Sequence, residues 1–286
     1  MLTDPPADTS SDEELCRAAV LGSPIAHSLS PVLHRAAYRA LGLSRWTYER
    51  RQVGGPDDPS LAEFLSGLGP QWRGLSVTMP VKETALACAD EVTPVAELVG
   101  AANTLIRSRE GWRAANTDVH GLVRTLGESG IATPRRALIL GAGATARAAC
   151  VALAELGVSG VDFAVRRQVR EGTSTVADRA GLDTGVRAID ELASYAGEYT
   201  LIISTLPTGV GIELPADGTG SPGPGGLLVD VVYGGWPTPL ARWASAGGAR
   251  VLSGREMLLH QAAAQVQLMT GREAPLSQMR AALAAV

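Results

Sequence analysis

A glycine-rich turn between an apolar strand and a helix constrains the fold of this chain more than any other feature. The apolar run 136–140 leads directly into GAGATA at 141–146, and an alanine-rich stretch predicts a helix over 146–156. Apolar residues return at 161–165, where the next strand is expected. A strand, a tight turn, a helix and a second strand make a βαβ unit, so this pattern predicts a parallel sheet.

Short apolar runs alternate with helical stretches along the rest of the chain as well. The other predicted strands are 16–21, 46–53, 74–77, 104–107, 201–204 and 227–232. The other predicted helices are one that opens at Pro31 and those over 59–65, 81–89, 94–99, 119–130, 254–270 and 275–285. The segment 216–226 is too rich in Gly and Pro for regular structure. A length of 286 residues allows two domains, and the alternation predicts an α/β fold.

Bulk composition excludes several classes of protein. The formal net charge of -4 argues against a general nucleic-acid binder. No apolar run approaches the roughly 20 residues that span a bilayer, so no membrane association is expected. The acidic segment 1–16 has no signal-peptide pattern and is expected to be a disordered leader. The 3 cysteines and 4 histidines show no metal-ligand spacing, which predicts no metal site and favours a reduced, cytoplasmic setting.

The glycine turn matches the G-x-G-x-x-A form of the dinucleotide fingerprint. Gly141 permits the tight turn, Gly143 lets the backbone approach a pyrophosphate, and Ala146 allows close packing of helix on strand. The following helix would offer its N–H groups to the phosphates. We therefore expect Gly141, Ala142, Gly143, Ala144 and Thr145 to bind a cofactor.

The end of the next strand indicates which dinucleotide is bound. An NAD site usually has an acidic residue there, but this chain has Arg166, Arg167 and Arg170. A carboxylate would repel a 2′-phosphate, whereas arginines bind it with charge-assisted hydrogen bonds. The sequence therefore favours NADP (NADPH).

Lys82 is the only lysine among 25 basic residues, and all the others are arginine. Arginine stays protonated in proteins, whereas a lysine can lose its proton where the site is arranged for it. Lys82 ends the segment SVTMPVK at 76–82, one of several polar segments outside the nucleotide turn. Each segment alone could be a helix cap or a turn, as at Ser30, Thr78, Asn103 or Asp118.

Together these segments resemble one family, the shikimate dehydrogenases, from about residue 17 to the C-terminus. The motifs that carry the resemblance are GSPIAHSLSP (22–31), SVTMPVK (76–82), AANTL (101–105), NTD-x-x-G (116–121), GAGATARA (141–148) and EMLLHQAA (256–263). The resemblance implies an enzyme that reduces 3-dehydroshikimate to shikimate with NADPH, in aromatic amino-acid biosynthesis. Family members occur as monomers and as homodimers, so either state is expected.

The resemblance also implies roles for residues at the matching positions. Ser28 and Ser30 would hold the substrate carboxylate, and Lys82 would be the acid–base residue, paired with Asp118. Further substrate contacts would come from Thr78, Asn103, Asp118, Tyr233 and Gln261. Thr205, Val231 and Gly254 would lie along the cofactor.

Carbonyl reduction needs a hydride on carbon and a proton on oxygen. Lys82 could donate that proton or act as an electrostatic clamp on the developing alkoxide, and the sequence leaves both roles open. A neighbouring Asp118 would favour the charged form of the lysine.

The predicted domains are a substrate-binding catalytic domain over 17–118 with 254–286 and a Rossmann-type NADP-binding domain over 119–253. The site is expected in the cleft where the domains meet. Some positions depart from the family pattern: Ser76 stands where asparagine is frequent, and Ala115, Ala144 and Val165 also differ. A quinate/shikimate dehydrogenase, an aminoshikimate dehydrogenase and a non-catalytic ligand-binding homologue are the alternatives. Ser30 and Arg166 argue against quinate, and the presence of Lys82 and Asp118 argues against a silent homologue.

Overall fold

The computed structural model describes residues 15–286, which form two compact units. One unit comprises the described residues up to Thr117 with Leu259–Val286, and the other comprises Asp118–Leu258. The leader expected over 1–16 lies outside the described residues except for Leu15 and Cys16, and Cys16 already begins a strand.

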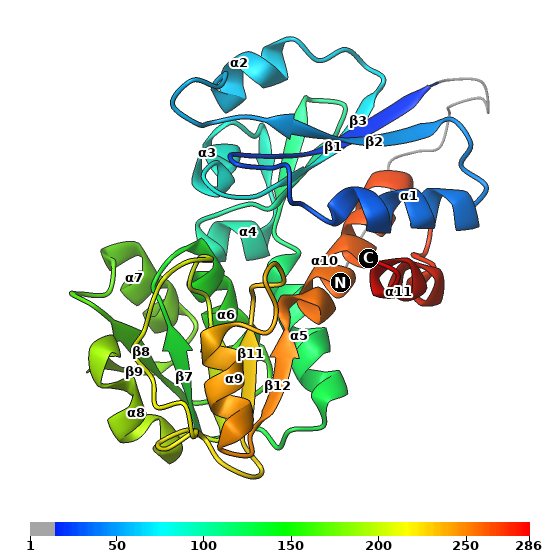
Figure 1. Ribbon diagram of the computed structural model, residues 1–286. Coiled ribbons are helices and arrows are strands. Elements are labelled where there is room, and N and C mark those ends of the chain that lie inside the picture. Colours follow the sequence, from blue (N-terminus) through cyan, green and yellow to red (C-terminus); the bar gives the residue numbers. More distant parts are fainter. Residues whose placement is uncertain (1–14) are drawn as a thin grey trace. The chain divides into compact units, whose positions relative to one another are not determined.

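The first unit contains a mixed sheet of six strands in the order β2-β1-β3-β5-β6-β4, of which β1, β2 and β3 are labelled in Figure 1. The strands are β1 (Cys16–Gly22), β2 (Trp46–Gln52), β3 (Trp72–Val77), β4 (Glu91–Val92), β5 (Thr104–Arg107) and β6 (Trp112–Ala115). β1 runs parallel to β2 and β3, while β5 is antiparallel to both β3 and β6. The carboxyl ends of β1, β3 and β6 and the amino end of β5 therefore lie at one edge of the sheet.

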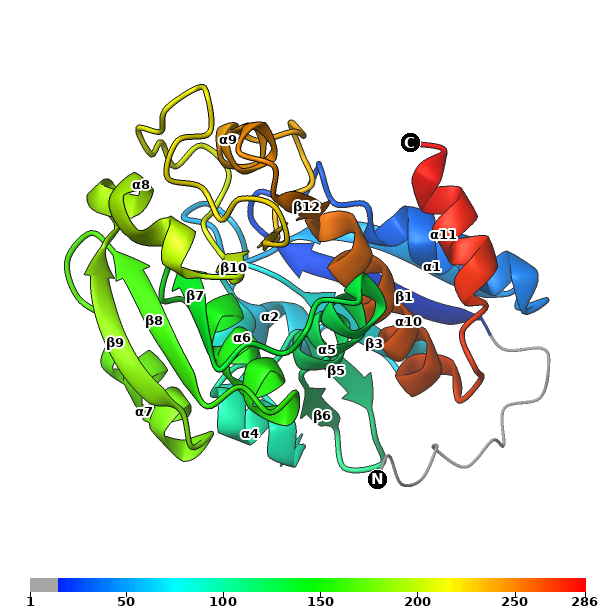
Figure 2. The ribbon, with the colours of Figure 1, turned by 90° about the horizontal axis from the view of Figure 1, so that it is seen from below.

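The helices of this unit begin and end at residues suited to those positions. They are α1 (Ser30–Ala40), α2 (Leu61–Ser66), α3 (Lys82–Ala87), α4 (Pro94–Val99), α11 (Leu276–Ala284) and the larger part of α10 (Gly254–Thr270). Pro31 lies in the first turn of α1, and Ser60 with Glu63 forms a capping box on α2. Thr93 caps α4, which ends at the left-handed Gly100. α1 and α11 lie side by side (Figures 1 and 2).

The second unit is a parallel six-stranded sheet in the order β12-β11-β10-β7-β8-β9. The strands are β7 (Arg136–Leu140), β8 (Gly160–Val165), β9 (Asp183–Ala188), β10 (Leu201–Ser204), β11 (Leu227–Asp230) and β12 (Arg250–Ser253). Counted within the unit, this is the 3-2-1-4-5-6 order of a Rossmann fold, and the strand order reverses between β7 and β10.

Helices cover both faces of the second sheet, as a parallel sheet requires. They are α5 (Asp118–Ser129), α6 (Ala144–Glu155), α7 (Glu171–Arg179), α8 (Leu192–Tyr195) and α9 (Pro239–Ala246). Figure 2 shows α8 and α9 on one face and α5, α6 and α7 on the other. Leu192 of α8 and Trp243 of α9 share a buried cluster with Leu138, Ile202 and Leu228 of the sheet. Within residues 15–286, no helix has the length and apolar character needed to cross a membrane.

The predicted α/β class is confirmed, and five elements have the predicted bounds: 94–99, 104–107, 136–140, 201–204 and 254–270. The segment 216–226 contains no helix or strand, as predicted. The strand expected over 227–232 ends earlier, at Asp230. Among the α-helices and strands of residues 15–286, seven were not predicted: β4, β6, β9, β12, α7, α8 and α9. β9 carries mostly exposed residues at the edge of its sheet and β4 has 2 residues, so neither has a strong apolar pattern.

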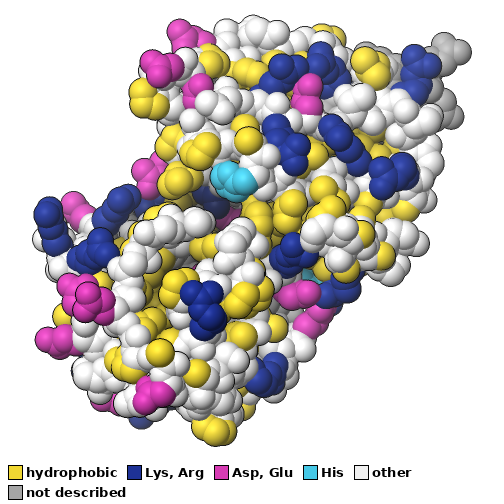
Figure 3. Space-filling model, viewed as in Figure 1, with side chains coloured by type: hydrophobic (Ala, Val, Ile, Leu, Met, Phe, Trp, Pro, Cys, Tyr) yellow, Lys and Arg dark blue, Asp and Glu magenta, His cyan; other side chains and the backbone are white. Residues whose placement is uncertain are grey.

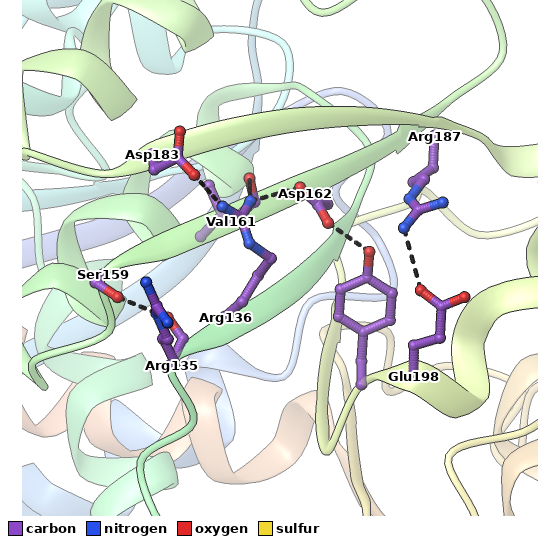
Figure 4. Close-up of polar contacts among 9 residues, drawn as sticks. Arg135, Arg136, Ser159, Val161, Asp162, Asp183, Arg187 and Glu198 are labelled. Atoms are coloured by element: carbon purple, nitrogen blue, oxygen red, sulfur yellow. Dashed lines mark hydrogen bonds and ion pairs between the residues drawn. The ribbon is translucent and has the colours of Figure 1, made fainter.

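A polar network ties together the amino ends of three strands in the second unit (Figure 4). Arg136 at the start of β7 binds Asp162 of β8 (Nη1 to Oδ1, 2.6 Å) and Asp183 at the start of β9. Tyr199 donates its hydroxyl to Oδ2 of the buried Asp162 at 2.5 Å. Burial and this hydrogen bond raise the pKa of Tyr199 to about 12, so the phenol keeps the proton that it donates.

Removing the Asp162 carboxylate should destabilise the protein clearly. Asp162→Ala would leave Arg136 and the Tyr199 hydroxyl without their shared partner, and we expect a loss of roughly 2–4 kcal/mol in the free energy of unfolding. Urea denaturation followed by circular dichroism measures it. The control is Glu198→Ala, which breaks the exposed pair with Arg187 and should cost less than about 0.5 kcal/mol. Equal losses in the two variants would contradict the assignment.

Candidate functional site

The predicted polar segments of the first unit meet at one edge of its sheet. The loop after β3 is bound to the loop after β1, because Ser23 N donates to Met79 O at 3.0 Å. Val77 N donates to Asn103 O at 2.7 Å, and Asn103 N donates to Ala115 O at 3.1 Å. Backbone hydrogen bonds thus hold together segments that are far apart in the sequence.

Ser28 and Ser30 form a buried pair of hydroxyls where α1 begins. Ser28 Oγ lies 3.3 Å from Ser30 Oγ and accepts from Ser30 N at 3.3 Å. Arg50 donates from Nε and Nη2 to the Ser28 carbonyl oxygen, at 3.0 and 2.6 Å. The backbone of this loop is therefore held from β2.

Lys82 is the first residue of α3 and is half-buried. Its carbonyl oxygen accepts from Ala102 N at 2.9 Å, which places its backbone beside the residue that precedes Asn103. Thr78, also half-buried, lies in the same loop, and a Cβ at Gly22 would come within 2.5 Å of its Cγ2. The close approach of the two loops therefore requires glycine at position 22.

Asn103 and Gln261 contact each other although 158 residues separate them in the chain. Asn103 Nδ2 donates to Gln261 Oε1 at 3.4 Å and to Thr117 Oγ1 at 2.9 Å. Thr117 N donates to Asn103 Oδ1 at 2.7 Å. Both predicted amide side chains are buried and their orientations are defined by these contacts.

Asp118 and Tyr233 belong to the second unit. Asp118 is the buried first residue of α5, and Tyr233 is half-buried in the loop after β11. That loop is anchored by Asp230, whose Oδ2 accepts from Thr238 Oγ1 at 2.7 Å and whose Oδ1 accepts from Val232 N at 3.3 Å. Burial raises the pKa of Asp230, while the hydrogen bonds favour the carboxylate.

Gly254 allows a tight backbone contact beside this loop. A Cβ at this position would lie 2.0 Å from Val231 O, and Gly254 N donates to Val232 O at 3.1 Å. Only glycine fits this approach, so Gly254 and Val231, both expected along the cofactor, lie side by side.

The glycine turn follows β7 at the point where the strand order reverses. Gly141 has a φ of +99°, and a Cβ there would lie 2.8 Å from Thr205 Oγ1 in the loop after β10. Thr205 donates to Leu140 O from its N at 2.9 Å and from its Oγ1 at 2.8 Å. The predicted cofactor residues Gly141 and Thr205 are therefore in direct proximity.

The start of α6 fits a pyrophosphate. Gly143 precedes α6, and among residues 15–286 no heavy atom lies within 4 Å of where its Cβ would be. No side chain in this part of the chain caps the helix, so N–H groups near Ala144 and Thr145 can donate to phosphate oxygens. Ala142 O accepts from the buried Thr173 Oγ1 at 2.9 Å, which fixes the turn from α7.

The three predicted arginines lie on the loop that joins β8 to α7. Arg166, Arg167 and Arg170 are exposed, and Arg166 Nη2 donates to Gly211 O at 2.9 Å. Figure 3 shows basic side chains gathered over this corner of the second unit. The loop follows the carboxyl end of β8, where an adenosine ribose is bound in Rossmann folds.

Several residues that orient the predicted ones were not found from the sequence. Thr173 holds the glycine turn, while Gln265, His34 and Tyr48 form a buried polar cluster near Asn103. Gln265 lies one helical turn after Gln261, which is a detectable signal of a shared helix face. Thr173 and Tyr48 have no such signal, because their roles depend on tertiary contacts.

Two family models match the chain. The model for the shikimate dehydrogenase substrate binding domain matches residues 20–105, and the model for the shikimate 5'-dehydrogenase C-terminal domain matches residues 254–284. The first match lies within the first unit. The second match begins in the last residues of the second unit, 254–258, and continues through 259–284 of the first unit.

Individual relatives match nearly the whole chain. The shikimate dehydrogenase (NADP(+)) of Anaeromyxobacter sp. (strain Fw109-5) is 38% identical and covers 93% of this chain and 95% of its own. The crystal structure of Mycobacterium tuberculosis shikimate dehydrogenase has a TM-score of 0.82 and 46% identity, covering 95% and 100%. Shikimate 5-dehydrogenase from Thermus thermophilus, in complex with NADP(H) and shikimate, has a TM-score of 0.79 and 32% identity, covering 94% and 99%.

Burial of His34 should make stability depend on pH below neutrality. Burial lowers the pKa of His34 from 6.5 to about 3, so the folded protein keeps the ring neutral while the unfolded chain takes up a proton. This stability is complete above pH 6.5 and is lost as the pH falls toward 3. Between pH 7.5 and 5.5, the loss due to His34 should be about 1.4 kcal/mol.

Unfolding free energies of wild type and His34→Gln, measured at both pH values, test this expectation. The variant should show a decrease smaller than the wild-type decrease by that amount. The matched change at the exposed His27, His27→Gln, should retain the wild-type dependence. An identical pH dependence in wild type and His34→Gln would rule out the neutral buried imidazole.

Proposed function

The chain belongs to the shikimate dehydrogenase family, and we propose that it reversibly reduces 3-dehydroshikimate to shikimate with NADPH in aromatic amino-acid biosynthesis. The observation that carries the proposal is that Ser28, Ser30, the Lys82 loop, Asn103 and Gln261 come together at one edge of the first sheet. These groups suit a small ring that carries a carboxylate and hydroxyls.

We assign the substrate carboxylate to the hydroxyls of Ser28 and Ser30. Both are buried neutral donors, so they can bind a carboxylate with hydrogen bonds and without a guanidinium. The amides of Asn103 and Gln261 bind the ring hydroxyls, since each amide offers both a donor and an acceptor. Thr78 and Tyr233 complete the proposed set of substrate contacts.

Lys82 is the proposed proton donor. When bound, NADPH supplies the hydride that reaches the carbonyl carbon. The ammonium group of Lys82 donates a proton toward the carbonyl oxygen, and its charge stabilises the negative charge that develops there. Asp118 is the second catalytic residue that we propose. The half-buried position of Lys82 lets it recover a proton from solvent.

The second unit carries the proposed cofactor site. Support comes from the positive φ of Gly141, the open space at Gly143 and the α6 N-terminus without a side-chain cap among residues 15–286. Arg166, Arg167 and Arg170 bind the 2′-phosphate, while Thr205, Val231 and Gly254 contact the remainder of the cofactor. Ala142, Ala144 and Thr145 contribute backbone groups to the pyrophosphate site.

We also infer a cytoplasmic location and a monomeric or homodimeric state. The proposed cofactor and substrate are metabolites of the cytoplasm, and the three cysteines, Cys16, Cys88 and Cys150, form no disulfide.

A spectrophotometric assay tests the proposed reaction. Purified protein is given shikimate, quinate or aminoshikimate with NADP or NAD, and formation of the reduced cofactor is followed by its absorbance. We expect the highest kcat/KM with shikimate and NADP. Preference for quinate with NAD would reject the proposal, and preference for aminoshikimate would replace the substrate while keeping the reaction class.

Lys82→Arg should separate catalysis from cofactor binding. Arginine keeps the positive charge but changes its shape and does not give up a proton, so kcat for shikimate should fall roughly 100- to 10,000-fold. The dissociation constant for NADP, measured by fluorescence titration, should change less than about threefold because Lys82 belongs to the other unit. A turnover close to wild type would contradict the role of Lys82.

Reversing one charge at the arginine loop should change cofactor preference. Arg166→Glu places a carboxylate where the 2′-phosphate is expected, so KM for NADP should rise roughly 100-fold while KM for NAD changes little. Steady-state kinetics with both cofactors measure this. Arg109→Glu, an exposed site in the first unit, gives the same change in net charge and should leave both KM values unaltered. A parallel rise for both cofactors in Arg166→Glu would contradict the assignment.

A further inference from the structure

Gln265 lies at the centre of a buried polar network that no predicted role explains. It is on α10, one turn after Gln261, and its side chain contacts residues of α1, β3 and β5 within the first unit. We propose that Gln265 is a positioning residue that orients Asn103 and links it to the pair Ser28 and Ser30. The groups that bind the ring hydroxyls and those that bind the carboxylate would then keep a fixed geometry relative to each other. This inference rests on the function proposed above.

The amide oxygen of Gln265 accepts two hydrogen bonds. Ser76 Oγ donates to Oε1 at 2.6 Å, and His34 Nε2 lies 3.3 Å from the same oxygen. Tyr38 Oη lies 3.4 Å from His34 Nδ1, so an imidazole protonated on Nε2 satisfies both neighbours. The neutral ring therefore defines which end of the Gln265 amide is the oxygen.

The amide nitrogen of Gln265 fixes the residue that the substrate would meet. Nε2 donates to the Asn103 carbonyl oxygen at 3.1 Å and to Thr104 Oγ1 at 2.9 Å. Thr104 Oγ1 then donates to Asn103 Oδ1 at 2.8 Å. Because Asn103 Oδ1 is held as an acceptor, Asn103 Nδ2 is directed toward Gln261 and Thr117.

A second branch of the network reaches the proposed carboxylate site. Tyr48 Oη donates to Ser76 Oγ at 2.6 Å, and Tyr48 also hydrogen-bonds with Ser30. The ring of His34 stacks on that of Tyr48, with centroids 4.0 Å apart. The path from Asn103 to Ser30 therefore passes through Gln265, Ser76 and Tyr48.

These hydrogen bonds explain why a serine suits position 76. Its hydroxyl accepts from Tyr48 and donates to Gln265, which needs a group that does both at one atom. The Ser76 hydroxyl thus fixes the Tyr48 hydroxyl and the Gln265 amide relative to each other. Ser76 is the position at which the chain departs from the frequent asparagine of the family.

A double-mutant cycle with Asn103 tests the positioning role. Gln265→Leu has a similar size but no amide, and we expect KM for shikimate to rise roughly 10- to 100-fold. KM for NADP should stay within about threefold of wild type, and kcat should change less than KM. In an Asn103→Ala background, the same Gln265→Leu change should raise KM less than about threefold, because the Asn103 side chain that Gln265 orients through Thr104 is absent.

The control is Gln267→Leu, the same substitution at an exposed position on the same helix, which should behave as wild type. Equal effects of Gln265→Leu with and without Asn103 would overturn the proposal, as would an unchanged KM for shikimate. A wild-type protein inactive on shikimate would instead reject the proposed function.

Ser76→Ala is a milder second variant for the case in which Gln265→Leu does not fold. It removes one hydrogen bond to Gln265 and one to Tyr48, and we expect a roughly three- to tenfold rise in KM for shikimate, with KM for NADP unaltered. A folded Ser76→Ala protein with wild-type KM for shikimate would overturn the proposal.

Discussion

Parallel strands bring their carboxyl ends to one edge of a sheet. The candidate substrate residues of the first unit and the candidate cofactor residues of the second unit each depend on this constraint. In the first unit, the segments after β1 and β3 and the segment before β5 share one edge because β5 runs antiparallel to β3. In the second unit, the glycine turn after β7 and the loop after β10 lie where the strand order reverses. The strand order and direction alone therefore make neighbours of residues that are far apart in the sequence.

In the second sheet, the stabilising polar network and the proposed cofactor residues lie at opposite ends of the strands. The Arg136–Asp162–Tyr199 network lies toward the amino ends of the strands, away from the turn at Gly141. The first unit instead uses a neutral framework: His34 loses its charge through burial, and amides and hydroxyls make the remaining contacts. A neutral network behind the predicted substrate residues avoids the cost of burying an unpaired charge.

The sequence predicted the α/β class well, because glycine, proline and apolar periodicity act locally. Motifs that keep a fixed order along the chain indicate Gly141, Ser30 and Lys82 as site residues, and these assignments stay predictions. Thr173 and Tyr48 could not be found, since a threonine on α7 or a tyrosine on β2 gains a partner only after the chain has folded. β9 was missed because its residues are mostly exposed, and β12 because its four residues are too few for the apolar run that marks a buried strand.

The single lysine at the start of α3 also has a practical consequence for chemistry performed on the protein. Lys82 carries the only lysine amine in 286 residues, and it is half-buried, not enclosed. Reagents that acylate amines do not modify guanidinium groups in the same way, so the arginine-rich surface is inert to them. One side-chain label per molecule would then report on the environment of α3, and its rate of attachment would measure how accessible that amine is in solution.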